Sequence, residues 1–118
     1  MPRPRALVVE DDLDLLFIYR QALAEAYDVA GAQSLQEAHE QLESGNPQLL
    51  ILDLWLPDGE GESLLREIEE DETIVIVATA QAHRGSSLCS HPAIELVLYK
   101  PVSFMQLRQL GRRYLSEE

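Results

Sequence analysis

Four short runs of consecutive apolar residues recur along the chain, at residues 6–9, 49–52, 74–78 and 96–98. Runs of this length without polar alternation are typical of strands that are buried on both faces of a sheet. A more polar candidate at residues 27–30 suggests a further strand at the edge of that sheet. The chain is therefore expected to fold around a sheet of about five strands.

The segments between these runs carry apolar residues at the spacing of an amphipathic helix. This spacing predicts helices around residues 16–23, 35–42, 64–68 and 104–114. Ser34 and Ser103 each precede a Glu or Gln by three residues, which is the capping-box pattern of a helix start, and Gly45 is expected to end the second helix. Strands that alternate with helices imply parallel pairing with right-handed crossovers, and therefore a doubly wound α/β sheet with helices on both faces.

Length, charge and cysteine content favour a single globular domain and argue against a nucleic-acid-binding, secreted or membrane protein. The 118 residues, 46% of them hydrophobic, suffice for one compact core, and we expect residues 1–118 to form a single domain. A formal net charge of −12 argues against binding DNA or RNA through the general surface. The single cysteine, Cys89, cannot form an internal disulfide, and the basic N-terminus lacks the long apolar run of a signal peptide or membrane span. A cytoplasmic location without a membrane partner follows.

Polar side chains stand where the predicted strands end. These residues are Glu10, Asp11, Asp53, Thr79 and Lys100. In an open α/β sheet the crevice at the carboxyl ends of the strands binds ligands, so the five side chains are expected to share one pocket. Each alone is explained as well by a helix cap, a turn residue or a solvated charge. Together they favour a functional site.

The carboxylates of this predicted pocket would repel one another unless a cation were bound between them. Mg²⁺ suits such a set because it takes a few carboxylates and is commonly completed by phosphate oxygens. The hydroxyl of Thr79 and the ammonium of Lys100 could then each meet an oxygen of a bound phosphoryl group. The residues therefore predict a Mg²⁺-dependent site for phosphoryl chemistry.

Four motifs in chain order resemble the receiver domains of two-component response regulators, of the CheY-like superfamily. They are the acidic pair that ends residues 7–12, the D-x-x-x-P-x-x-x-G pattern at 53–61, the Ala-Thr-Ala of 78–80 and the Tyr-Lys-Pro of 99–101. The resemblance covers nearly the whole chain. It implies a flavodoxin-like fold with strand order 2-1-3-4-5.

The resemblance also implies roles in metal binding and phosphoryl transfer. Asp53 would be the phospho-acceptor, attacking a phosphohistidine of a sensor histidine kinase or phosphotransfer protein. Mg²⁺ would be ligated by Asp11, by Asp53 and by the backbone carbonyl of Trp55. Glu10 would assist, through a bound water.

Other residues of the motifs would hold the phosphoryl group or shape the backbone. Thr79 would hydrogen-bond the acyl phosphate and Lys100 would pair with it, while the Lys100–Pro101 peptide is expected to be cis. Gly61 is expected to permit a close approach of the backbone into the third helix. Asp58 is expected to serve the Pro-Asp-Gly turn.

Two features depart from the family pattern. Val97 stands three positions before the lysine, where receivers commonly carry an aromatic residue. Residues 81–93 contain Gly85, three serines and Pro92, so they are a poor helix former where the fourth helix should lie. The coupling from Thr79 to an aromatic side chain, and the output face beside it, are therefore expected to be unusual.

The leading hypothesis is a phosphorylation switch whose altered surface controls an unknown output protein, or an output domain absent from this chain. Receivers often pair through the face formed by the fourth and fifth segments, so a homodimer is among the expected partners. The alternative is a pseudo-receiver that binds a protein independently of phosphorylation. A phosphatase acting on a separate substrate is disfavoured, because Trp55 stands where such enzymes need an acid. We therefore expect no enzyme activity beyond the domain's own phosphorylation and dephosphorylation.

Overall fold

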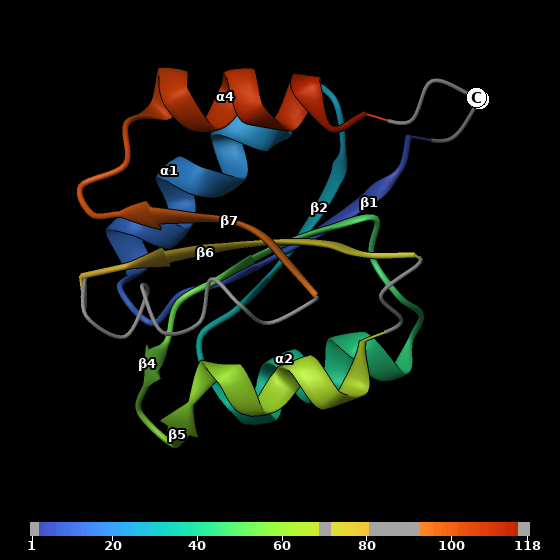
Figure 1. The fold of residues 1–118 in the computed structure, drawn as a ribbon, viewed down its shortest axis with the longest axis vertical. Coiled ribbons are helices and arrows are strands. Elements are labelled where there is room, and N and C mark those ends of the chain that lie inside the picture. Colours follow the sequence, from blue (N-terminus) through green and yellow to red (C-terminus); the bar gives the residue numbers. More distant parts are fainter. Residues whose placement is uncertain (1–2, 69–71, 81–92, 116–118) are drawn as a thin grey trace.

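Five parallel strands form the central sheet of the computed structural model, which describes residues 3–68, 72–80 and 93–115 (Figure 1). In spatial order they are β2 (Asp28–Ala32), β1 (Arg5–Val9), β3 (Leu49–Leu52), β6 (Ile74–Thr79) and β7 (Ile94–Tyr99). The labels β4 and β5 belong to a separate hairpin, so this order is the predicted 2-1-3-4-5. The doubly wound α/β fold is confirmed, with the more polar β2 at one edge.

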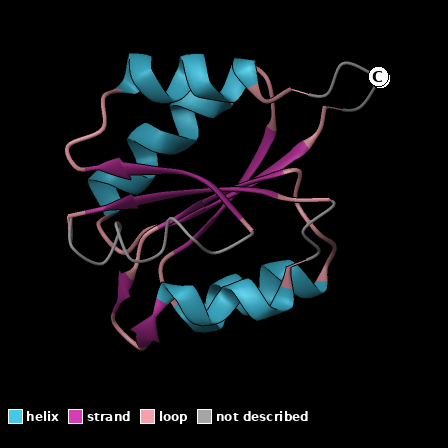
Figure 2. Ribbon diagram, viewed as in Figure 1, coloured by secondary structure: helices cyan, strands magenta, loops and turns pink. Residues whose placement is uncertain are grey.

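Helices cover both faces of the sheet (Figure 2). On one face α1 (Leu13–Leu23) and α4 (Phe104–Arg113) bury Leu16, Tyr19 and Leu107 in one apolar cluster. On the other face α2 (Leu35–Glu43) and the helix η1 (Gly61–Glu67) bury a second cluster that includes Leu42 and Leu64. The fully buried strand β3 lies between the two clusters. This explains why its sequence is a continuous apolar run.

The register of the sheet aligns the ends of its inner strands. Val9, the last residue of β1, is the partner of Leu52, the last residue of β3. The N–H of Asp53 donates to the carbonyl oxygen of Val9 at 3.0 Å, which extends this pairing by one residue. The residues that follow β1 and β3 therefore emerge side by side.

The residues predicted to start and end helices form the expected caps in the structure. The hydroxyl of Ser34 accepts from the N–H of Glu37 at 3.1 Å, and the hydroxyl of Ser103 accepts from that of Gln106 at 3.0 Å. Gly45, with φ of +140°, ends α2 and donates its N–H to the carbonyl oxygen of Leu42. Each serine satisfies an amide that the first turn of a helix leaves unpaired.

The third helix differs from its prediction. Its apolar spacing predicts an α-helix around residues 64–68, whereas η1 is a seven-residue 3₁₀ helix that ends before Ile68. The segment is short, and Ile68, in an extended conformation, closes it with an i to i−3 bond to the carbonyl of Leu65. Leu64 and Leu65 still reach the core. The irregular segment predicted at residues 81–93 lies outside the described residues, except for the buried Ala93.

The last helix is fixed to the residue just before β2 by a buried hydrogen bond. The hydroxyl of Tyr27 donates to the carbonyl oxygen of Gly111 at 2.7 Å. That carbonyl belongs to the last turn of α4, where no partner within the helix is available. Among the described helices, none combines the length and apolar character that crossing a membrane requires.

Candidate functional site

The carboxylates of Glu10, Asp11 and Asp53 converge at the carboxyl ends of β1 and β3. One oxygen from each of the three lies within 4.8 Å of the others. Glu10 and Asp53 are buried, at 1% and 5% exposure, whereas Asp11 is exposed. The structure thus brings together the three carboxylates that the sequence analysis selected, and it leaves one of them open to solvent. Hard oxygen donors in this arrangement can hold a divalent cation.

Lys100 places its ammonium group against two of these carboxylates. Its Nζ atom lies 2.6 Å from Oε1 of Glu10 and 3.1 Å from Oδ2 of Asp53. The backbone N–H of Lys100 donates to the carbonyl of Thr79 at 2.9 Å, which holds the residue at the end of β7. The peptide to Pro101 is cis, as expected. A cationic side chain therefore already partly neutralises the acidic pocket.

Burial and charge shift the protonation of this cluster. Burial raises the pKa of Glu10 to about 7, and the charge of Asp53 acts in the same direction against the opposing effect of Lys100. Burial alone would lower the pKa of Lys100, but its hydrogen bond to Glu10 and the charge of Asp53 outweigh this effect and raise it. The ammonium is therefore charged at neutral pH. The site keeps a positive group beside Asp53 throughout the physiological range.

Thr79 and Trp55 complete the predicted set. Thr79 is fully buried at the end of β6, next to the strand that leads to Lys100. The N–H of Trp55 donates to Oδ1 of Asp53 at 3.3 Å, while its indole side chain is 46% exposed. The backbone of Trp55 thus lies beside the acidic cluster. Its side chain faces solvent at the rim.

Comparison with known proteins identifies the family. The model of the response regulator receiver domain matches residues 6–111. The chain belongs to this family. The receiver domain of a LuxO repressor protein described as putative, from Vibrio parahaemolyticus, has a TM-score of 0.82 and 33% identity over 95% of this chain and 89% of its own.

Two further relatives place this receiver among signalling proteins. The response regulator TrrA of Thermotoga maritima, solved in complex with Mg²⁺-BeF, has a TM-score of 0.79 and 30% identity, covering 95% of this chain and 99% of its own. The transcriptional regulatory protein KdpE of Staphylococcus aureus is 31% identical over 88% of this receiver. This chain spans 46% of the length of KdpE, which is therefore a longer protein.

In this receiver, only glycine fits at position 61, because the backbone there makes a close contact. A Cβ atom added there would lie 2.1 Å from the carbonyl oxygen of Asp53, a distance that no side chain tolerates. The N–H of Gly61 also donates to the carbonyl of Leu54 at 2.8 Å. The expectation of a close approach at this glycine is confirmed, and its partner is the backbone of the proposed phospho-acceptor itself.

Asp58 has a role that the sequence analysis missed. Rather than only serving its turn, its carboxylate accepts hydrogen bonds from the backbone N–H groups of Leu35 and Gln36, at 2.8 and 3.0 Å. These bonds lower the pKa of Asp58. No local pattern reveals the contact, because the partners lie 23 and 22 residues earlier in the chain.

Val97, the position of the missing aromatic residue, is partly buried against the cluster under α2. Tyr99 lies two residues further along β7 and is 46% exposed. Strand alternation places both side chains on the same face of the sheet. The aromatic ring is therefore at the rim, while an aliphatic side chain occupies the deeper position.

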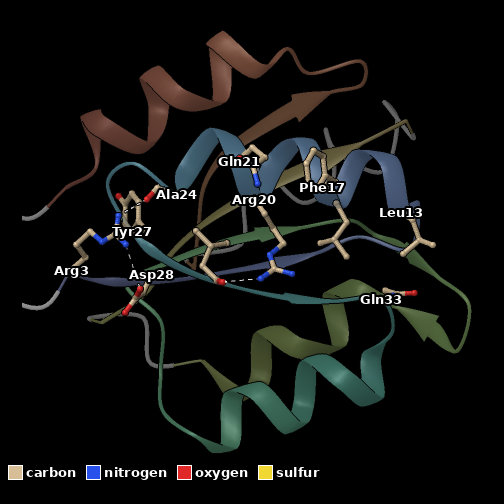
Figure 3. Close-up of a pocket in the computed structure, with 11 residues that line it drawn as sticks. Arg3, Leu13, Phe17, Arg20, Gln21, Ala24, Tyr27, Asp28 and Gln33 are labelled. Carbon is tan, nitrogen blue, oxygen red and sulfur yellow. Dashed lines mark hydrogen bonds and ion pairs between the residues drawn. The ribbon is translucent and has the colours of Figure 1, made fainter.

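A surface hollow of about 540 Å³ lies away from this site, between α1 and β2 (Figure 3). Arg20 of α1 crosses it, and its guanidinium donates to the carbonyl oxygen of Val29 in β2 at 3.3 Å. A Cβ atom on Gly31 would lie 3.1 Å from Cδ of Arg20. The missing side chain at Gly31 thus makes room for the stem of the arginine.

Proposed function

We propose that this receiver accepts a phosphoryl group on Asp53 in a Mg²⁺-dependent reaction and thereby switches the surface that it presents to an output partner. The observation that carries the proposal is the cluster of three carboxylates within 4.8 Å of one another, with the ammonium of Lys100 at 3.1 Å from Asp53. The Mg²⁺-BeF complex of TrrA, a relative with 30% identity, supports the same assignment.

The residues present fit a magnesium ion. All the donors are oxygens, one carboxylate is exposed to solvent, and the remaining positions of the ion can be filled by water and phosphate. Asp11, Asp53 and the backbone carbonyl of Trp55 would hold it, with Glu10 acting through a water molecule. When bound, the ion would neutralise negative charge on the phosphoryl oxygens.

The chemistry of the protein is nucleophilic attack followed by charge stabilisation. An oxygen of Asp53 forms a bond to phosphorus while the bond from phosphorus to the imidazole nitrogen of the donor breaks, and the imidazole leaves with the bonding electron pair. Lys100, which now pairs with Asp53, would pair with the transferred group. The hydroxyl of Thr79 would donate to one of its oxygens.

The donor would be a sensor histidine kinase or phosphotransfer protein, and the location cytoplasmic. The reaction would be limited to the domain's own phosphorylation and dephosphorylation. The output partner would be a separate protein, a second copy of the chain or a further domain, as the greater length of KdpE suggests. The position of Val97 favours one alternative, a pseudo-receiver that binds its partner without phosphorylation.

Intact mass and tryptophan fluorescence test the proposal together. Acetyl phosphate with Mg²⁺ should add one phosphoryl group to the protein, and a beryllofluoride mimic should change the emission of Trp55, the single tryptophan, in a saturable manner. Both effects should vanish without Mg²⁺ and in Asp53→Asn. A folded protein that shows neither an adduct nor a Mg²⁺ response would overturn the switch and favour the pseudo-receiver.

A further inference from the structure

The loop that follows Asp53 is attached to a helix at its far end. It forms the hairpin of β4 (Trp55–Leu56) and β5 (Gly59–Glu60), with Asp58 at the turn. Both carboxylate oxygens of Asp58 are used, one on the N–H of Leu35 and one on that of Gln36. The chemistry proposed above does not use this side chain.

Asp58 and Ser34 together accept hydrogen bonds from the first three backbone amides of α2. Asp58 accepts from the first two amides of the helix, and Ser34 accepts from the third, that of Glu37. These amides carry the positive end of the helix dipole and lack partners within the helix. Both residues therefore cap the start of α2, but only Asp58 belongs to the hairpin that follows Asp53.

The other end of the hairpin is fixed at the site. Trp55 faces Glu60 and Leu56 faces Gly59 across the two strands. Below them, the N–H of Gly61 donates to the carbonyl of Leu54. The loop is thus closed at its base beside Asp53 and held at its tip by α2.

Apolar packing reinforces the attachment at the tip. Gly59 has φ of +149°, and a Cβ atom there would lie 2.6 Å from Cδ1 of Leu35. The hairpin backbone therefore lies against the first residue of α2. The side chain of Leu56 is buried in the cluster under the same helix. The hydrogen bonds of Asp58, the contact between Gly59 and Leu35 and the burial of Leu56 therefore couple the position of the hairpin to that of α2.

We propose that Asp58 is a positioning residue for the Mg²⁺ site. Trp55 is one residue from Leu56, whose strand partner Gly59 directly follows Asp58. If the bonds from Asp58 to α2 were lost, β4 would be held less firmly. The carbonyl of Trp55 in β4 would then be less well placed to bind the ion together with Asp53. This inference rests on the proposed function, because it assigns Asp58 a task at that same site.

Asp58→Ala is compared with Ser34→Ala, a matched variant that also removes a cap from α2 but leaves the hairpin untouched. Titration with MgCl₂, followed by Trp55 fluorescence, should show that Asp58→Ala weakens Mg²⁺ binding roughly tenfold, a loss typical of removing an outer positioning partner. Ser34→Ala should bind Mg²⁺ as the wild type does. Asp58→Asn, which keeps one acceptor oxygen, should fall between them.

Amide hydrogen exchange without metal gives a second readout. Asp58→Ala should speed exchange at the amides of Trp55 and Gly61 as well as at the start of α2, whereas Ser34→Ala should affect the helix alone. Equal weakening of Mg²⁺ binding by both variants would overturn the positioning role, since the effect would then come from helix stability. Unchanged binding in Asp58→Ala would overturn it too.

The two proposals fail in different ways. If the wild type binds no Mg²⁺, the proposed function fails, and the positioning role at a metal site fails with it whatever the exchange data show. If the wild type binds Mg²⁺ and forms the adduct while Asp58→Ala binds Mg²⁺ equally well, only the positioning role is lost.

Discussion

At the scale of single residues, Lys100 is the positive group that the acidic pocket already contains. Its Nζ atom is within 3.1 Å of oxygens from both Glu10 and Asp53. A positive group so close to the carboxylates lowers their mutual repulsion, but it also repels an incoming cation. Under the proposed function Lys100 would serve two requirements, neutralising the carboxylates and then pairing with the phosphoryl group.

Replacing Lys100 by methionine should separate these two requirements. In Lys100→Met we expect Mg²⁺ to bind more tightly by roughly fivefold or more, because removing a positive charge from beside the carboxylates that would hold the ion is worth about 1 kcal/mol or more. Fluorescence titration of Trp55 with MgCl₂ measures this, with Lys100→Arg, which keeps the charge, as the control. Weaker binding in Lys100→Met would show that the ammonium does not oppose the ion.

The sequence could predict most residues of the site because they stand where strands end. Glu10, Asp53 and Lys100 each directly follow a strand, and Thr79 is the last residue of one. Val9 and Leu52 end their strands in register, so the positions of Glu10 and Asp53 follow from the sheet alone. Asp58 could not be predicted in the same way. Its partners, Leu35 and Gln36, lie on a helix that precedes β3, and only the packing of that helix brings them to the hairpin.

At the scale of secondary-structure elements, His39 joins α2 to η1. Its Nδ1 atom lies 2.6 Å from Oε1 of Glu67 in η1, and its Nε2 atom lies 3.1 Å from Oε2 of Glu43 in α2. The hydrogen bond to Glu67, followed by the charges of the two carboxylates, raises the pKa of His39 above its ordinary value. The link between the helices is therefore strongest when the imidazole is protonated.

The pH dependence of stability should reveal this link. Because the pKa of His39 is higher in the folded state, its contribution is complete below the unfolded pKa of about 6.5 and is lost as pH rises through the folded value. Thermal unfolding should show wild type more stable than His39→Gln near pH 6, with the difference vanishing near pH 9. Parallel pH profiles for the two proteins would contradict the link, and Glu67→Gln should behave as His39→Gln does.

Periodicity predicted a helix that overlaps η1, but it predicted neither the start at Gly61 nor the 3₁₀ type. Leu64, Leu65 and Ile68 have spacings that both an α-helix and a 3₁₀ helix can bury in the same core. The helix also starts under a tertiary constraint, because Gly61 is bonded to Leu54 and packed on Asp53. Such a constraint is set by tertiary structure, which a local pattern does not contain.

At the scale of the whole molecule, added cations should stabilise the protein in two separate ways, and only the first follows from the net charge of −12. Any salt screens the general repulsion among the acidic residues. A cation that binds the site adds a specific contribution that grows with its concentration relative to its dissociation constant. The second effect requires the acidic cluster, whereas the first does not.

Chemical unfolding can distinguish the two effects. MgCl₂ at about 100 times the dissociation constant should stabilise the protein by about 2–3 kcal/mol more than NaCl of equal ionic strength. The excess should disappear in Asp11→Asn, while the response to NaCl should remain. Equal stabilisation by the two salts would mean that Mg²⁺ acts only through screening.

The arginine that crosses the hollow beside β2 also bears on how the molecule behaves when concentrated. An edge strand presents unpaired backbone groups that a strand from another molecule can extend. Here Arg20 lies over Gly31 and its guanidinium binds the carbonyl oxygen of Val29, so part of that edge is already used by the protein's own helix. Arg20 thus occupies a backbone acceptor that a strand of another molecule would need in order to pair with β2.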